Sequence, residues 1–250
     1  MSGRVQDRVI VVTGAARGQG EAHTAALAAE GAIVIATDVN EPAAREGIHA
    51  RVLDVSDADG WAALADSIKG EFSRVDGLIN NAGVTSRVRL GEVELDDWNR
   101  VLAINVTGAM LGIQALMPLM SAGASIVNVG SVAGLTGHYT AAYTTSKWAL
   151  RGLTQCAATE LGTRGIRVNA VHPGYIETPM TASAPPAFKP ANEALIPLGR
   201  GGQPEEVAGL MVFLMSGESS YLNGAEIAID GGFSGGAAAK SLSDALRKGS

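Results

Sequence analysis

The sequence predicts an α/β fold in which one parallel sheet of about seven strands carries helices on both faces. Two observations lead to this prediction. Short runs rich in Val and Ile alternate with Ala- and Leu-rich stretches along the chain, which is the pattern of strands that alternate with helices. The Val/Ile runs are also apolar at successive positions, so each strand is expected to be buried on both faces, as strands of parallel sheets are.

The expected strands are the β-branched segments 8–14, 32–38, 50–55, 75–83, 124–131, 166–171 and 225–230. The expected helices are 22–30, 56–72, 96–120, 142–161 and 204–215, the second of which begins with Ser56 as its N-cap. Because crossovers between parallel strands are right-handed, this alternation favours a doubly wound, Rossmann-like sheet over a barrel.

The chain is predicted to be organised as a single domain over residues 1–233, because no repeat, charge block or linker divides it. Residues 175–203 form a Pro- and Ala-rich segment that is too long for an ordinary connection. Since it follows the C-terminal end of a strand, we expect a lid over a site rather than a plain surface excursion. Residues 234–250 are rich in Gly, Ala, Ser and Lys and are expected to form a partly disordered tail.

Composition argues against several classes of protein. The net charge of −6 disfavours nucleic-acid binding, because phosphate contacts need clustered Lys and Arg. No segment approaches the roughly 18 uninterrupted apolar residues of a membrane span, and the N-terminal apolar run is too short for a signal peptide. The single cysteine, Cys156, is expected to be a core thiol, and the histidines lack the spacing of a metal site. We therefore expect no metal, no membrane and a cytoplasmic protein.

Three glycines, Gly14, Gly18 and Gly20, lie between the first strand and the first helix. Glycines allow a sharp turn and a close approach of pyrophosphate to the helix N-terminus, although the G-x₃-G-x-G spacing differs from the usual G-x-G-x-x-G and a plain tight turn is the alternative. Asp38, which closes the second strand, can accept hydrogen bonds from ribose hydroxyls and would repel a 2′-phosphate, so it favours NAD. Arg17 favours NADP instead, and Asp38 could simply cap the turn that follows it.

Tyr143 and Lys147 lie four positions apart in "AAYTTSKWAL", on one face of a predicted helix. They are either a pair on a solvated surface or a phenol and an ammonium arranged for proton transfer. The rest of the chain decides between these readings. With "TGAARGQG", "NNAG", "YTTSK" and "HPG" in this order, the sequence resembles the short-chain dehydrogenase/reductase family over nearly its whole length, especially bacterial members that act on hydroxysteroids and other bulky secondary alcohols.

The resemblance implies a Rossmann-like domain, a nicotinamide cofactor, commonly a homotetramer, and the catalytic residues Asn105, Ser131, Tyr143 and Lys147. Tyr143 would exchange the proton with the substrate, with its pKa lowered by the Lys147 ammonium. Ser131 would hydrogen-bond the substrate oxygen, and Lys147 would also bind the nicotinamide ribose. Asn105 would anchor a water that links Lys147 to solvent.

The resemblance also implies where the cofactor and the substrate would bind. Asp54 and Val55 would contact adenine, residues 81–83 would pass the adenosine ribose, and residues 173–178 would lie beside the nicotinamide. Gln19 stands where Ile or Leu is commoner in the family, and it makes an additional polar contact with the cofactor possible. The implied cofactor residues are Gly14, Arg17, Gly18, Gln19, Gly20, Asp38, Asp54, Val55, Asn81, Ala82, Gly83, Tyr143, Lys147, Pro173, Gly174, Ile176 and Thr178. The implied substrate residues are Ser131, Tyr143, Tyr175 and Met180.

The function expected from these observations is NAD-dependent interconversion of a bulky secondary alcohol, hydroxysteroid-like or aryl-alkyl, and its ketone. The apolar composition of 175–203 favours a neutral, ring-containing substrate. One alternative is a 3-oxoacyl thioester reductase, which would favour NADPH and a basic patch such as Arg87 and Arg89. The other is a non-catalytic protein that senses NAD or serves as a scaffold, which the presence of all the catalytic residue types disfavours.

Overall fold

The computed structural model describes residues 3–248 and contains one seven-stranded, fully parallel sheet with the strand order β3-β2-β1-β4-β5-β6-β7. Between β1 and β4 the direction of strand addition reverses, which is the point where doubly wound sheets bind ligands. The predicted fold class is therefore confirmed. The strands are β1 (Val9–Thr13), β2 (Ile33–Asp38), β3 (Ile48–Val52), β4 (Gly77–Asn80), β5 (Ser125–Val129), β6 (Arg167–Pro173) and β7 (Glu226–Ile229).

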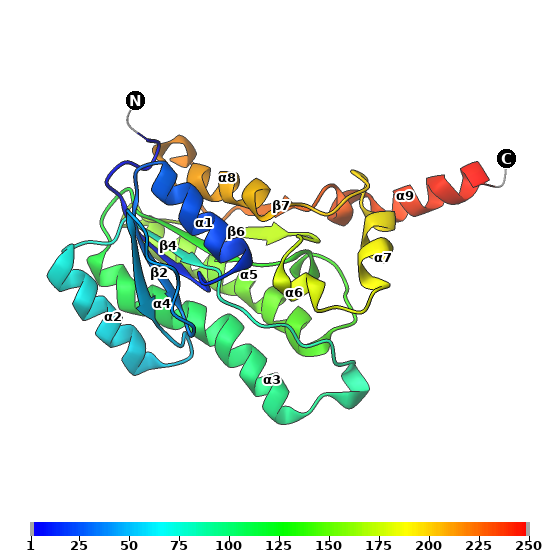
Figure 1. The fold of residues 1–250 in the computed structure, drawn as a ribbon, viewed down its shortest axis with the longest axis horizontal. Coiled ribbons are helices and arrows are strands. Elements are labelled where there is room, and N and C mark those ends of the chain that lie inside the picture. Colours follow the sequence, from blue (N-terminus) through cyan, green and yellow to red (C-terminus); the bar gives the residue numbers. More distant parts are fainter. Residues whose placement is uncertain (1–2, 249–250) are drawn as a thin grey trace.

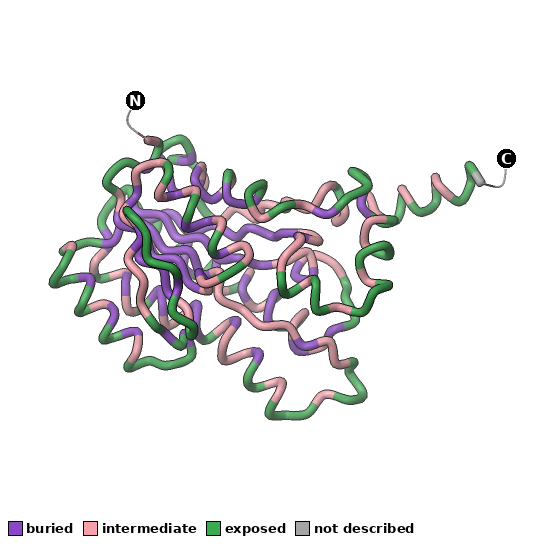
Figure 2. The backbone as a smooth tube through the Cα atoms, viewed as in Figure 1, coloured by how far each residue is buried: buried purple, intermediate pink, exposed green. Residues whose placement is uncertain are grey.

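Helices cover both faces of the sheet (Figure 1). α1 (Gly18–Ala29) and α8 (Pro204–Met215) pack together on one face, where Leu27 and Met211 are fully buried against the strands. α2 (Ala58–Glu71), α4 (Gly108–Leu116) and α5 (Ala141–Gly162) cover the other face. Figure 2 shows the result, a buried sheet between half-exposed helices, as expected for strands that are apolar on both faces.

Two predicted helices differ from the observed ones. The N-cap predicted at Ser56 lies one residue later, at Asp57, whose side chain accepts from the Asp59 N–H. Ser56 does not cap the helix because its hydroxyl donates to the Asp54 carboxylate at 2.7 Å. The single helix predicted over 96–120 consists of α3 (Leu95–Leu102), a wide π-helical turn (Ala103–Thr107), α4 and a 3₁₀ turn (Met117–Leu119). Further 3₁₀ turns cover Leu90–Glu92, Val132–Gly134 and Gly217–Ser219.

The C-terminal part of the chain differs most from expectation. Of the tail predicted as partly disordered, residues 234–248 belong to helix α9 (Phe233–Lys248), which projects from the body of the protein (Figure 1), and 249–250 lie outside the described residues. Its Lys240 donates to the Ala194 carbonyl at the end of α7 (Phe188–Leu195), in the segment predicted as a lid. The same segment contains the short helix α6 (Pro179–Ala182).

Two further predictions concern the burial of Cys156 and the lack of a membrane span. Cys156 is exposed, because the buried stripe of α5 runs through Leu150, Thr154 and Leu161 and leaves the thiol on another face. The continuous helical stretch Leu95–Leu119 is long and apolar enough, with a mean hydropathy of 1.5, to satisfy a length-and-composition test for crossing a membrane. Core helices pass the same test, and α4 within this stretch buries Ile113 and Leu116 against the sheet.

Candidate active site

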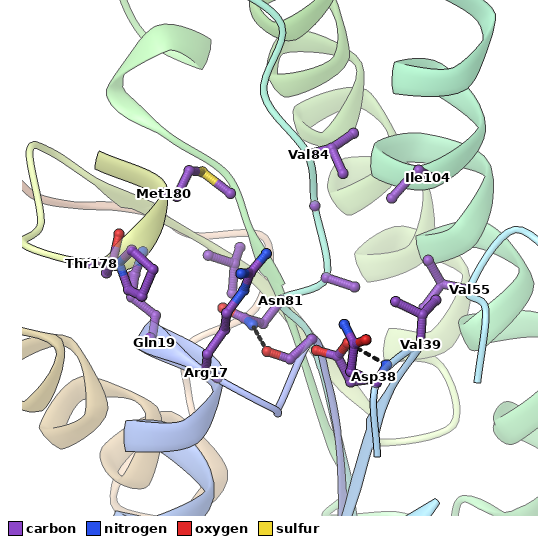
Figure 3. A pocket seen from close by; sticks show the side chains of 18 of the residues that line it. Arg17, Gln19, Asp38, Val39, Val55, Asn81, Val84, Ile104, Thr178 and Met180 are labelled. Atoms are coloured by element: carbon purple, nitrogen blue, oxygen red, sulfur yellow. Dashed lines mark hydrogen bonds between the residues drawn. The ribbon is translucent and has the colours of Figure 1, made fainter. Parts of the chain in front are cut away.

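A cavity of about 280 Å³ opens at the C-terminal ends of β1, β2, β4 and β5, beside the switch point of the sheet. Fifteen of the predicted site residues line it (Figure 3). They are Gly14, Arg17, Gly18, Gln19, Gly20, Asp38, Asp54, Val55, Asn81, Ala82, Gly83, Tyr143, Lys147, Thr178 and Met180.

The glycine-rich loop after β1 requires glycine for two separate reasons. Gly14 and Gly18 have φ values of +66° and +62°, in the left-handed region that L side chains rarely adopt. Gly20 has no room for a side chain, since a Cβ there would lie 2.0 Å from the Gly14 carbonyl oxygen. The Asn81 amide fixes the loop by donating to the carbonyls of Thr13 (2.9 Å) and Gly14 (3.1 Å). Three glycines at the N-terminus of α1 thus leave backbone N–H groups accessible between the Arg17 and Gln19 side chains, which is the chemistry that binds a pyrophosphate.

Two opposite charges lie near this loop. The Asp38 carboxylate accepts hydrogen bonds from the backbone N–H groups of Ala16 (3.2 Å) and Asn40 (3.1 Å), which fix it at the end of β2 on the cavity wall. The Arg17 side chain reaches into the space between Thr178 and Val55 (Figure 3). Within residues 3–248 Arg17 has no ion pair, so its charge is uncompensated by the protein.

The wall beyond Asp38 is shaped by a turn that contains Asp54 and Val55. The Asp54 carboxylate accepts from the backbone N–H of Ser56 at 2.9 Å, and the Val55 carbonyl accepts from the Trp61 indole at 2.9 Å. Both residues line the cavity with their backbone fixed by these bonds. The sequence-based placement of this pair beside the cofactor site is therefore compatible with the geometry.

Gln19 has an unusual environment for an amide. Its Oε1 is buried and has no hydrogen-bond partner among residues 3–248, while the residue lines the cavity at the start of α1. A buried carbonyl oxygen without a donor is unfavourable by roughly 1–3 kcal/mol, so a bound ligand that donates a hydrogen bond there would be stabilised. The unpaired oxygen suits a hydrogen-bond donor of a dinucleotide cofactor, such as a hydroxyl or the carboxamide, whereas the backbone N–H groups of the glycine loop suit its phosphates.

Tyr143, Ser131 and Lys147 come together at the other end of the cavity. Ser131 is the N-cap of the Val132–Gly134 turn, where its Oγ accepts from the Ala133 N–H at 3.2 Å, and its side chain lies close enough to the Tyr143 hydroxyl to lower the pKa of that phenol. Lys147 is 4% exposed; its Nζ lies 5.7 Å from the centre of the Tyr143 ring and donates to the Val129 carbonyl at 2.8 Å. The two residues are therefore not a solvated surface pair.

The electrostatics of this group differ in one respect from expectation. Burial raises the pKa of Tyr143, and the hydrogen bond with Ser131 lowers it by a smaller amount. Burial also lowers the pKa of Lys147 to about 8. The expected lowering of the Tyr143 pKa by the ammonium is not found: burial dominates and raises the pKa, and the contribution that lowers it comes from Ser131.

Asn105 lies in the π-helical turn and is 2% exposed. Its Oδ1 accepts from the Val84 N–H (2.8 Å), and its Nδ2 donates to the Val84 carbonyl (3.0 Å) and the Ser146 hydroxyl (3.0 Å). The side chain therefore fastens the loop after β4 to α5, one residue before Lys147. A Cβ on Gly83 would lie 3.3 Å from Asn105 Oδ1 and 3.6 Å from Lys147 Nζ, so all three meet at one point.

The predicted residues that do not line the cavity are Asn105 and Ser131, which adjoin Lys147 and Tyr143 behind the wall, and Pro173, Gly174, Tyr175 and Ile176. Gly174 packs against Asp230, where a Cβ would lie 2.8 Å from its Cα, and Ile176 is buried. Tyr175 lies edge-on to the Phe188 ring of α7, with a centroid distance of 5.8 Å, rather than in the cavity. The lining residues that the sequence did not predict are Val39, Asn40, Leu53, Val84, Ile104, Val129, Gly130 and Pro179. Most of them adjoin predicted residues, and Val84 and Ile104 are apolar neighbours of Gly83 and Asn105.

One cavity thus contains the glycine loop of residues 14–20, the Asp38 carboxylate, and the Tyr143 phenol close to the buried Lys147 ammonium. Such a set can bind a dinucleotide and exchange a proton with an oxygen placed beside Ser131 and Tyr143. Over residues 3–248, no group of three or more His, Cys, Asp or Glu side chains is placed to hold a metal ion.

Comparison with known proteins adds independent findings. A family model described as enoyl-(acyl carrier protein) reductase matches residues 14–234. The trans-4-hydroxycyclohexanecarboxylate dehydrogenase of Sinomonas cyclohexanicum is 41% identical over 254 residues, covering 94% of this chain and 96% of the relative. A 3-alpha-(or 20-beta)-hydroxysteroid dehydrogenase of Mycobacterium bovis is 42% identical over 243 residues, covering 93% of this chain and 91% of the relative.

Two further comparisons extend this set. A 3-oxoacyl-(acyl-carrier-protein) reductase of Thermotoga maritima is 41% identical over 242 residues, covering 92% of this chain and 98% of the relative. The solved structure of the ligand-free aldohexose dehydrogenase of Thermoplasma acidophilum matches with a TM-score of 0.87 at 31% identity, covering 94% of this chain and 96% of that chain.

Proposed function

The chain belongs to the short-chain dehydrogenase/reductase family, and we propose that it is an NAD(H)-dependent dehydrogenase that interconverts a ring-bearing, bulky secondary alcohol and its ketone. Membership makes it an oxidoreductase of alcohol and ketone groups and implies a nicotinamide cofactor. The single observation that carries the proposal is that Tyr143 and buried Lys147 line one end of a cavity whose other end is a glycine loop, with Lys147 Nζ 5.7 Å from the centre of the Tyr143 ring.

The proposed chemistry follows from the position of Ser131, Tyr143 and Lys147. The nicotinamide, when bound, supplies the carbon that accepts or returns hydride. Tyr143 takes the hydroxyl proton of the alcohol in oxidation and returns it to the ketone oxygen in reduction. Ser131 holds the substrate oxygen beside the phenol, which fixes the geometry of proton exchange. Lys147, with a pKa of about 8, is mostly protonated at neutral pH, and its charge favours the phenolate that the oxidation needs.

The preference for NAD rests on Asp38. Its carboxylate is fixed on the cavity wall by two backbone N–H groups, so it cannot turn away from a ligand without losing them. A 2′-phosphate placed beside it would meet like charge, whereas ribose hydroxyls would donate to it. Arg17 could attract such a phosphate, but its side chain is exposed and held by no ion pair within residues 3–248, and we give the fixed group more weight.

A ring-bearing substrate is supported by apolar side chains on the cavity wall. Val84, Ile104 and Met180 line the cavity, and Met180 can adapt its shape to an irregular apolar ligand. Two relatives are named for ring alcohols, a hydroxycyclohexanecarboxylate and hydroxysteroids. We extend this preference to the present chain, together with a homotetrameric state and a cytoplasmic location as further proposals of the same kind.

A second candidate is a 3-oxoacyl thioester reductase, which the Thermotoga maritima relative favours. Arg87 and Arg89 follow β4 as the basic residues such a reductase would use. Arg87, however, donates to the Met180 carbonyl at 2.9 Å, and the Arg89 guanidinium lies 5.0 Å from the centre of the Tyr139 ring. Both guanidinium groups thus already have partners within the chain, which makes this candidate the weaker one.

Initial rates of NADH and NADPH formation or consumption, followed by absorbance, test the proposal. The substrates are cyclohexanol, a hydroxysteroid, propan-2-ol and an acetoacetyl thioester. We expect the ring alcohols with NAD to give the highest kcat/KM. The thioester with NADPH as the better pair would favour the second candidate, and absence of turnover with all of them would oppose both.

A further inference from the structure

His172 is a buried titratable residue that the proposed chemistry leaves without a role. It is 0% exposed and lies near the C-terminal end of β6, where its backbone pairs with Ala228 of β7. Its ring packs on Gly130, since a Cβ on that glycine would lie 2.5 Å from His172 Nδ1. The imidazole therefore occupies the space directly behind the end of β5, which leads into Ser131.

The ring nitrogen Nδ1 lies 3.2 Å from the backbone carbonyl oxygen of Ser131. A carbonyl oxygen can only accept a hydrogen bond, so Nδ1 carries the proton and donates it. The other nitrogen, Nε2, is buried and has no partner in the described part of the chain. The only contact that the imidazole makes as a hydrogen-bonding group is thus the one with Ser131.

The turn that begins at Ser131 is also held at its far end. Arg151 donates to the Gly134 carbonyl at 3.1 Å and forms a bidentate pair with Glu226 of β7, with Nε 2.8 and 2.9 Å from the two carboxylate oxygens. Gly134 packs against the backbone of α5, where a Cβ would lie 2.7 Å from the Lys147 carbonyl oxygen. One end of the turn is therefore fixed by His172 and the other by Arg151.

We propose that His172 is a positioning residue, whose Nδ1–H fixes the Ser131 carbonyl and thereby directs the Ser131 hydroxyl toward Tyr143. This inference rests on the proposed function, in which the Ser131 hydroxyl holds the substrate oxygen. It explains a polar ring in an otherwise apolar stretch of β6, because Val or Leu at this position would fill the space and leave the carbonyl without a donor. The distance of 3.2 Å and the lack of any other partner assign the ring to this single contact.

The surrounding charges keep the imidazole in the required form. Burial is the largest effect and lowers the pKa of His172. The hydrogen bond to the Ser131 carbonyl and the charge of Glu226 raise it, and Arg151 and Lys147 lower it by smaller amounts. The ring is therefore neutral at physiological pH, with one proton, and the Ser131 carbonyl determines which nitrogen carries it.

Three variants separate the donor from the shape of the ring. His172→Asn places an amide N–H near the position of Nδ1, His172→Gln places one near the position of Nε2, and His172→Leu fills the space without a donor. We expect His172→Leu and His172→Gln to lower kcat for a ring alcohol by roughly 10- to 100-fold, because even a small displacement of a catalytic group slows the reaction. The kcat of His172→Asn should stay within about threefold of the wild-type value. The Kd of NADH, measured by fluorescence titration, should be unchanged in all three.

A pH profile gives a readout that a purely structural role would not move. The hydrogen bond with Ser131 lowers the pKa of Tyr143 against the effect of burial, so its loss raises that pKa further. The rising limb of kcat for oxidation should therefore move to higher pH in His172→Leu and not in His172→Asn. The charged group that faces Tyr143 is Lys147, 5.7 Å from its ring, and it is unchanged in all the variants.

The outcomes are distinguishable. Wild-type kcat and pH profile in His172→Leu, or equal losses in His172→Asn and His172→Leu at equal thermal stability, would overturn the inference. If His172→Leu does not fold, the comparison of His172→Asn with His172→Gln decides, and equal kcat in those two would also overturn it. Wild-type protein without turnover on any alcohol, despite NADH binding, would instead overturn the proposed function itself.

Discussion

At one end of the cavity the loop of residues 14–20 presents backbone, whereas at the other end Ser131, Tyr143 and Lys147 present side chains. Position 20 of this loop has no room for a side chain, since a Cβ on Gly20 would overlap the Gly14 carbonyl. The catalytic end instead buries the Lys147 ammonium beside the half-buried Tyr143, and desolvation disfavours the charged form of each. The glycine loop thus depends on the lack of a side chain at position 20, and the catalytic end depends on the removal of water from Lys147 and Tyr143.

This difference has a functional consequence. A loop that offers backbone N–H groups contributes to the affinity for phosphate, and a buried acid–base group contributes to the rate of the chemical step. Substitutions at the two ends should therefore change different quantities, the Kd of the cofactor at one end and kcat at the other.

The largest effect is expected from Tyr143→Phe. The ring and its packing remain, but the proton that moves to and from the substrate oxygen is lost, so kcat should fall by roughly 10²- to 10⁴-fold. Steady-state assays with a ring alcohol and NAD measure this. Tyr139→Phe, at an exposed position four residues earlier, is the matched control and should leave kcat unchanged. Substantial turnover in Tyr143→Phe would remove Tyr143 as the acid–base group.

The loop end is tested by Gly20→Ala. The added methyl group would lie 2.0 Å from the Gly14 carbonyl oxygen, so the loop must shift, at a cost of about 1–3 kcal/mol in the free energy of unfolding. We expect the Kd of NADH to rise at least tenfold, roughly 1.4 kcal/mol of binding free energy. Gly209→Ala in α8, where no atom lies within 4 Å of the new Cβ, is the control and should bind NADH normally. Unchanged NADH affinity in Gly20→Ala would place the phosphates elsewhere.

Asp38→Asn sharpens the comparison within the cofactor end. The amide keeps a hydrogen-bond acceptor for the Ala16 N–H but loses the charge that repels a 2′-phosphate. The ratio of kcat/KM for NAD to that for NADP should fall by roughly tenfold, about 1.4 kcal/mol of discrimination. Asp54→Asn, which changes another carboxylate on the same wall, should change the ratio much less. A wild-type preference for NADP would transfer the discriminating role to Arg17.

The smallest effect concerns the pH dependence of stability. The pKa of Lys147 is about 8 in the folded protein and 10.5 in an unfolded chain. Between these values the unfolded state binds more protons, so the free energy of unfolding contributed by this group rises with pH, by at most about 1.4 kcal/mol per pH unit. Below pH 8 the group adds no slope. The free energy of unfolding, measured with urea between pH 8 and 9.5, should show this rise in the wild type and not in Lys147→Met. If the free energy changed with pH in the same way in both proteins, the ammonium would be better solvated than its burial indicates.

The sheet was predictable because the inner strands β1, β4, β5 and β6 are buried along their whole length and read as short β-branched runs between helical stretches, whereas the edge strands β3 and β7 are only partly buried. The helix ends were less predictable, since Ser56 and Asp57 can both cap a helix, and the hydrogen bond of Ser56 to Asp54 decides between them. The helical state of 233–248 depends on contacts such as Lys240 with the end of α7, which are not readable from a Gly/Ala/Ser-rich segment.

The candidate site shows the same division. Motif spacing was enough to place Tyr143, Lys147 and the glycine loop around one cavity. It could not give the direction in which the pKa of Tyr143 moves, because that depends on how deeply the phenol is buried. Nor could it predict the π-helical turn at Asn105, which brings the amide to the backbone of Val84, or the place of Tyr175 against Phe188.

The separation of binding from chemistry along the cavity is tested most directly by titrating NADH into Tyr143→Phe and following the fluorescence of the bound cofactor. Because the phenol ring and the glycine loop are unchanged, the Kd should lie within about threefold of the wild-type value, less than 1 kcal/mol, while kcat is nearly lost. A Kd raised as far as that of Gly20→Ala would contradict the account, because Tyr143 would then act by holding the cofactor rather than by moving a proton.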